Sequence, residues 1–202
     1  MKKSISFLAL VLSTVFLFHA PAFAAPYKID PDHTAVTFKI KHLLSRVEGR
    51  FNQFEGTFEY DPEKPETWKA QATIQAASID TNVAPRDKHL RSADFFDVEK
   101  FPTIIFESTQ VTNVTPTGAK LNGLLTIHGI QKPVVLDLEI HGVIKDPWGN
   151  VKAGFTATTK INRKDFGLTW NQVLETGQFL VGEEAAITLE VEGLLQEGSQ
   201  TK

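Results

Sequence analysis

Most of the chain alternates apolar and polar residues with a period of two, which is the spacing of a strand with one buried face. The clearest example has Val134, Leu136, Leu138 and Ile140 on a single face. The same alternation predicts eight long strands, over residues 35–42, 47–60, 69–79, 104–109, 120–127, 134–141, 151–161 and 184–193. A ninth, short strand is expected at 27–29.

The short links between these strands imply antiparallel neighbours, so the candidate folds are a sandwich and a closed barrel. Strands of about ten residues favour an eight-stranded barrel, which leaves no exposed edge. Glycines within the apolar faces suit the bends that closure requires: Gly49, Gly56, Gly123 and Gly193. A change of phase near Asn52 or Gln53 predicts a bulge there, and residues 129–133 are expected to form a short hairpin connection.

Two segments interrupt the alternation, and the first runs from Thr81 to Pro102. Thr81 or Asn82 suits a helix cap, Pro85 suits a first turn, and a weak helical stripe follows at Val83, Leu90 and Ala93. This pattern predicts a helical insertion between strands. Our hypothesis is that the insertion plugs one end of the barrel, and the alternative is a crossover with ordinary core phenylalanines.

The second interruption covers residues 162–183, and a loop this long in a compact domain is usually functional or locally structured. It contains Arg163, Asp165 and Trp170. Arg163 either pairs with Asp165 across a turn or binds an anionic head group. Trp170 is either a core residue or part of a portal.

Residues 1–24 have the features of a cleaved signal peptide. Lys2 and Lys3 precede an apolar stretch over 5–18, which is too short to span a membrane, and Ala22-Phe23-Ala24 offers a cleavage site. We therefore expect residues 25–202 to form the mature domain, exported to the periplasm.

The composition and the motif content of the chain limit the partners, cofactors and catalytic sites that can be expected. The net charge is −3 and the sequence has no cluster of lysine and arginine, so no nucleic-acid partner is expected. The absence of cysteine excludes disulfides and thiolate sites, and the histidines are not spaced as metal ligands on one element. No cofactor or metal is expected, and no nucleophile elbow or dinucleotide fingerprint is present. Fifteen phenylalanines against two tyrosines suit a dry interior.

Small residues on the inward faces suggest a hollow barrel. Five alanines would leave volume open: Ala70, Ala72, Ala76, Ala153 and Ala157. The alternative is that neighbouring phenylalanine rings fill this volume. A hollow without ionisable groups would select a long hydrocarbon.

Four stretches resemble the YceI-like family of polyisoprenoid-binding periplasmic proteins: HLRSADFFDVEKFPTIIFEST (89–109), LNGLLTIHGIQKPVVLDLE (121–139), INRKDFGL (161–168) and FLVGEEAAITLEVE (179–192). The resemblance spans essentially the whole mature chain. It implies a lipocalin-like antiparallel β-barrel, often dimeric, that holds a long isoprenoid or similar lipid and is not an enzyme. The matching motif positions are His89, Phe95, Phe96, Phe106, His128, Arg163, Asp165, Phe166 and Gly167.

Together these observations predict a non-catalytic carrier of a polyisoprenoid or similar lipid, in transient contact with a membrane or with membrane proteins. The expected tail-binding residues are Val36, Phe38, Ile40, Ile74, Phe106, Leu125, Leu138 and Phe155. Residues expected to complete the site are His42, His89, Arg163, Phe166 and Trp170. A head group such as a quinone ring or a pyrophosphate would lie at the mouth. Two alternatives remain, an interaction module with a filled core and a lipid-modifying enzyme that uses the inward-facing His42.

Overall fold

The computed structural model describes residues 26–196, so the predicted signal peptide lies outside the described residues. The strands are β1 (Pro26–Ile29), β2 (Ala35–His42), β3 (Ser45–Phe51), β4 (Phe54–Glu59), β5 (Lys69–Gln75), β6 (Ile79–Asp80), β7 (Thr103–Thr115), β8 (Gly118–Ile127), β9 (Ile130–Lys145), β10 (Val151–Asn162) and β11 (Val181–Leu195). The helical elements are α1 (Ala84–Arg91) and the short 3₁₀ helices η1 (Pro65–Thr67), η2 (Ala76–Ser78) and η3 (Arg163–Phe166). None of the helices among these residues has the length and hydropathy of a membrane span.

The strands close into one antiparallel barrel with eight positions around it. β1 and β2 both pair with β11, and β4 and β3 pair in turn with β1 and β2. β5 then pairs with β4, and β6 pairs with β3. β7 pairs with β5, and strands β7 to β11 follow in chain order and complete the ring. The eight predicted long strands and the helical insertion are therefore confirmed. The predicted irregularity is also present, because β3 ends at Phe51 and β4 begins at Phe54.

The connection between β8 and β9 is tighter than expected. Ile127 pairs with Ile130, so the turn consists of His128 and Gly129 alone, and Pro133 already lies within β9 opposite Leu124. Both turn residues have positive φ, 52° and 72°, as in the two-residue turns that match strand twist. The hairpin was predicted correctly, but its bounds of 129–133 were wrong.

Aromatic side chains fill one end of the barrel. Tyr27 stacks on Phe58 with ring centroids 5.0 Å apart, and Phe155 meets the edges of Phe58 and Tyr60 at 5.3 and 4.9 Å. Trp68 packs against Tyr60 at 4.6 Å. We call these five residues the aromatic floor.

The floor corrects part of the prediction from alanine positions. Ala153 is 1% exposed and belongs to the same cluster, and Ala70 packs against it. Ala157 is buried with Leu121 and Leu136. These alanines accommodate neighbouring side chains instead of leaving open volume, so the filled alternative is correct for this end of the barrel.

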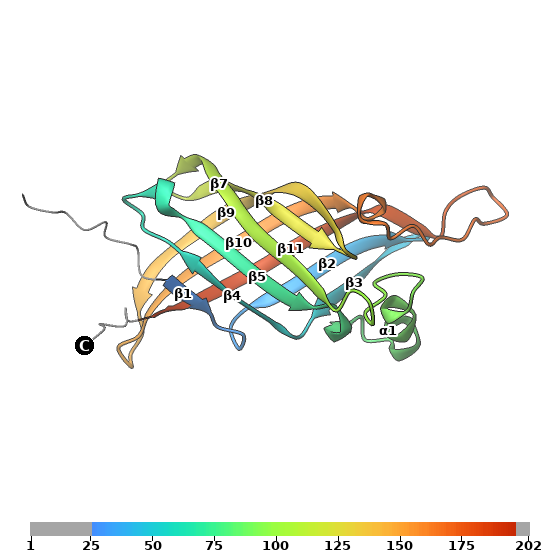
Figure 1. Cartoon of the computed structure of the whole chain (residues 1–202), viewed down its shortest axis with the longest axis horizontal. Helices are drawn as coiled ribbons and strands as arrows, with labels where there is room; N and C mark the ends of the chain where they lie inside the picture. The colour runs from blue at the N-terminus through green and yellow to red at the C-terminus, as the bar shows by residue number, and fades with distance from the viewer. Residues whose placement is uncertain (1–25, 197–202) are drawn as a thin grey trace, which may run out of the picture.

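The helical insertion and the loop after η3 lie at the opposite end of the barrel from β1 (Figure 1). The predicted cap was wrong, since the N-cap position is occupied by Val83 and no side chain caps the helix. The predicted stripe was also wrong in part: Val83 and Ala93 are exposed, and Leu90 alone packs against the core. Pro85 lies in the first turn, as expected.

Gly193 tests how tightly the floor is packed. A Cβ at this position would overlap the ring of Phe58, whereas a Cβ at Gly154 would have His141 as its nearest neighbour, at 3.5 Å. We expect Gly193→Ala to lower the free energy of unfolding by about 1–3 kcal/mol, the usual effect of overpacking. Gly154→Ala is the matched control and is expected to change it by less than about 1 kcal/mol. Urea unfolding followed by circular dichroism measures both, and equal effects would contradict this description of the floor.

Candidate functional site

A cavity of about 560 Å³ occupies the barrel between the aromatic floor and the helical insertion. This volume is within the range of small-molecule sites. Of the thirteen predicted site residues, ten line it: Val36, Phe38, Ile40, His42, Ile74, His89, Phe106, Leu125, Arg163 and Trp170. They come from strands β2, β5, β7 and β8, from α1, and from η3 and the loop that follows it.

Three predicted site residues lie elsewhere. Phe155 is part of the aromatic floor and Leu138 packs against that cluster, so the expectation that both line the cavity was wrong. Both side chains do face inward, but at the filled end of the barrel. Phe166 is 2% exposed and belongs to the core cluster that includes Ile127 and Leu168. Its role in the described structure is packing.

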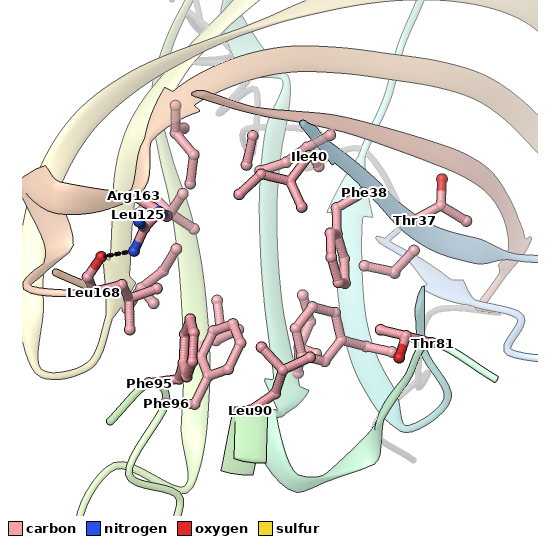
Figure 2. Close-up of a pocket in the computed structure, with 18 of the residues that line it drawn as sticks. Thr37, Phe38, Ile40, Thr81, Leu90, Phe95, Phe96, Leu125, Arg163 and Leu168 are labelled. Atoms are coloured by element: carbon pink, nitrogen blue, oxygen red, sulfur yellow. Dashed lines mark hydrogen bonds between the residues drawn. The ribbon is translucent and has the colours of Figure 1, made fainter. Parts of the chain in front are cut away.

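The insertion forms one wall of the cavity. Leu90, Phe95 and Phe96 lie across the open space from Phe38 and Ile40 (Figure 2). The inward contribution of Leu90, Phe95 and Phe96 supports the plug hypothesis over a crossover that only connects strands. The sequence pattern did not identify these residues as cavity lining. A short apolar stripe on a helix and a cluster of phenylalanines are as typical of a filled core as of a cavity wall.

Buried polar groups hold the insertion in place. The Asp87 carboxylate is 6% exposed and accepts hydrogen bonds from the backbone N–H (2.9 Å) and the hydroxyl of Thr81, which is 4% exposed. Arg86 donates from Nε to the Thr81 hydroxyl, at 2.7 Å, and from Nη2 to the Thr81 carbonyl, at 2.8 Å. Arg91 donates from Nε to the carbonyl of Ala77, at 2.7 Å. Helix α1 is therefore fixed to Thr81 and to η2 by hydrogen bonds from both of its ends.

An aromatic cluster joins the two interruptions of the strand pattern. The His89 ring meets Phe95 and Trp170 edge-on, with centroids 5.0 and 4.9 Å apart, and Phe95 lies 5.1 Å from Trp170. A hydrogen bond of 2.8 Å connects His89 Nε2 with Asp94. Trp170 thus bridges the insertion and the second loop at the edge of the cavity.

Arg163 is a buried cation beside the cavity. It makes no ion pair with Asp165 in the described structure, so the expectation that Arg163 pairs with Asp165 across a turn was wrong. Its Nε donates to the Gly182 carbonyl at 2.8 Å, and its Nη1 donates to the Leu168 carbonyl (Figure 2). Its Nη2 is buried and has no hydrogen-bond partner among residues 26–196. Burial lowers the pKa of Arg163, while the charge of Glu183 acts in the opposite direction.

A second polar cluster lies outside the cavity. Ligand atoms of Asp30, His33 and Glu192 approach within 4.8 Å of one another, as in a cation site. The Lys152 ammonium already lies 2.6 Å from Glu192 and 3.6 Å from Asp30. Hydrogen bonding to Glu192 is the main reason why the pKa of Lys152 is raised. We therefore interpret the cluster as an ion-pair network.

The fold and its cavity define a class of protein: a closed antiparallel barrel with an apolar internal pocket that is walled at one end by a helical insertion. The chain matches the YceI-like domain family over residues 27–193 and belongs to that family. It is 41% identical over 199 residues to a UPF0312 protein of Pseudomonas aeruginosa, a match that covers 97% of this chain and 100% of the relative.

Solved structures agree with this assignment. The YCEI protein of Campylobacter jejuni superposes with a TM-score of 0.68 at 34% identity, over 78% of this chain and 90% of that one. A polyisoprenoid binding domain from Saccharophagus degradans superposes with a TM-score of 0.63 at 13% identity, over 84% of this chain and 98% of that one. The second match shows a shared fold alone.

Asp87 tests whether buried hydrogen bonds fix the cavity wall. Asp87→Ala leaves two buried donors of Thr81 without their acceptor, so we expect the free energy of unfolding to fall by about 1–3 kcal/mol. Asp94→Ala removes a carboxylate that is 56% exposed and is the matched control, with an expected loss below about 1 kcal/mol. Hydrogen exchange of the insertion should accelerate in Asp87→Ala only. Equal exchange rates in the two variants would contradict this role for Asp87.

Proposed function

We propose that the protein is a non-catalytic carrier that holds a polyisoprenoid or a similar long-chain lipid inside its barrel. The observation that carries the proposal is the cavity of about 560 Å³ with predominantly apolar lining. Apolar surface removed from water contributes about 25 cal/mol per Å². A chain that replaces water along these side chains therefore gains several kcal/mol after the ordering costs of binding.

The same cavity argues against a filled-core interaction module. An internal volume of this size is costly unless something occupies it, because its lining forgoes packing contacts. The shared fold adds support, since one solved structure of this fold is described as a polyisoprenoid binding domain. The apparent signal peptide at 1–24 supports action in the periplasm, where a lipid that moves between membranes needs a carrier through water.

The enzyme alternative has less support. His42 lines the cavity, but no side-chain hydrogen bond orients its ring among the described residues. His89 does have an orienting carboxylate in Asp94, but its ring packs edge-on against Phe95 and Trp170, and this packing favours a structural role. A general base needs an orienting partner and a reacting group within hydrogen-bond reach. We therefore favour binding without turnover.

Two neighbouring alanines on β11 provide a direct test. Ala185 lines the cavity, whereas Ala186 pairs with Lys39 and Lys160 on the outer face. We expect Ala185→Trp to fill the cavity and lower the amount of bound lipid at least tenfold, and Ala186→Trp to retain it. Native mass spectrometry of protein purified from its own source, followed by extraction of the bound lipid, measures this. Lipid retained equally by both variants, or absent from the parent protein, would contradict the proposal.

Transient membrane contact is part of this proposal. Leu44 is fully exposed in the turn after β2, and Phe179 is 54% exposed in the loop before β11. A hydrogen bond of 3.0 Å from the Leu43 N–H to the Leu180 carbonyl connects these two segments. His42, which precedes Leu43, and Leu180, which follows Phe179, both line the cavity. Lys164, which pairs with Glu183, lies 5.3 Å from the Phe179 ring. The exposed apolar side chains of the tip therefore suit insertion into the interface of a bilayer.

Leu44→Asp tests the membrane contact. We expect it to slow transfer of a fluorescent prenyl lipid from anionic vesicles at least fivefold, because a carboxylate opposes insertion into the interface. Ile144→Asp is the matched control, since Ile144 is 63% exposed in the strand next to the β9–β10 turn, away from the cavity. Stopped-flow fluorescence measures the rate. Equal rates for both variants would show that the tip does not dock on the bilayer.

A further inference from the structure

The titratable side chains that line the cavity are all basic. They are His42, Arg86, His89 and Arg163. No aspartate, glutamate or lysine of the described residues is among the lining, although the chain as a whole has 24 aspartate and glutamate residues against 21 lysine and arginine residues. A hydrocarbon alone needs none of these groups. Their presence therefore indicates which kind of polar head group the ligand has.

The basic groups differ in how far the protein already satisfies them. His89 shares a hydrogen bond with Asp94, and Arg86 donates twice to Thr81. Arg163 is 4% exposed and donates only to backbone carbonyls. The nearest acidic group that affects it, Glu183, pairs with Lys164 instead. Arg163 thus differs from Arg86 in having a buried guanidinium nitrogen without a hydrogen-bond partner among the described residues.

A buried guanidinium without a carboxylate partner is costly, and an anion that approaches it recovers part of that cost. The Nη2 atom has no partner among the described residues and is enclosed by the protein, so no hydrogen bond inside the described structure neutralises the guanidinium charge. The side chain has a fixed orientation, because Nε and Nη1 are both bonded. Arg163 therefore presents a fixed positive charge beside the cavity.

From this arrangement we propose that the cavity selects an acidic long-chain lipid, with a carboxylate or a phosphate at its end, and that Arg163 is the residue that recognises the acid. The inference rests on the proposed carrier function. The head group lies at the end where the insertion and the loop after η3 meet. The tail extends towards the aromatic floor, where Tyr27 and Phe155 leave no room for a polar group.

The experiment compares ligands that share one chain and differ only in the head: farnesoic acid, methyl farnesoate, farnesol and farnesyl monophosphate. Displacement of the neutral probe N-phenyl-1-naphthylamine from delipidated full-length protein gives each affinity. We expect the acid to bind at least tenfold more tightly than its methyl ester, and the monophosphate at least tenfold more tightly than the alcohol. Equal affinities within each pair would overturn the proposal, and this comparison requires no variant.

Arg163→Gln assigns the preference to this residue. We expect the ratio of acid to ester affinity to fall to about one while ester affinity stays within twofold. Lys160→Gln is the matched control, since it removes one positive charge from the outer face of β10, the strand that precedes η3, where Lys160 pairs with Glu184. Arg163→Lys provides a second variant that keeps the charge if Arg163→Gln does not fold, and it should retain part of the preference. An unchanged ratio in a folded Arg163→Gln protein, or an equal fall in Lys160→Gln, would refute the role of Arg163. Failure of all four ligands to displace the probe would contradict the carrier function itself.

Discussion

The stacking of aromatic rings at one end of the barrel determines where the protein has room for another molecule. Tyr27, Phe58 and Phe155 come from strands β1, β4 and β10, and their rings meet across the barrel axis. Eight strands enclose an interior that side chains are just able to fill. Because the five rings of the aromatic floor pack directly against one another, they close the cavity at its base, and the interior stays open towards the insertion.

The other end of the barrel is built from the two segments that break the strand pattern. The insertion supplies Leu90, Phe95 and Phe96, and the loop after η3 supplies Trp170 and the backbone carbonyl that fixes Arg163. This division gives the interior two chemical characters. The strands supply an apolar wall, and the two irregular segments supply most of the basic groups. An amphiphile with its polar end at the irregular segments matches both.

The alternation of side chains predicted the eight long strands and their inward faces, and strand length together with the family resemblance favoured a barrel over a sandwich. Alternation identified seven residues of the cavity correctly because inward orientation depends only on local periodicity, whereas His89, Arg163 and Trp170 lie in the two interruptions and were named from motifs and residue type. It misplaced Leu138 and Phe155, since height along the barrel axis depends on strand register, which periodicity does not encode. The hydrogen bonds of Arg163 could not be predicted from the sequence either. One of its partners is the backbone carbonyl of Gly182, which lies nineteen residues away. Whether an arginine pairs with a carboxylate or with the backbone is decided by tertiary structure.

The central claim is that the space between the aromatic floor and the insertion belongs to a bound lipid. A crystal structure of the protein as isolated, without removal of lipid, tests this claim most directly. We expect elongated non-protein density bordered by Phe38, Phe106 and Leu125, with its polar end near Arg163. Side chains of the protein that fill this space, with no density for a guest, would contradict the account.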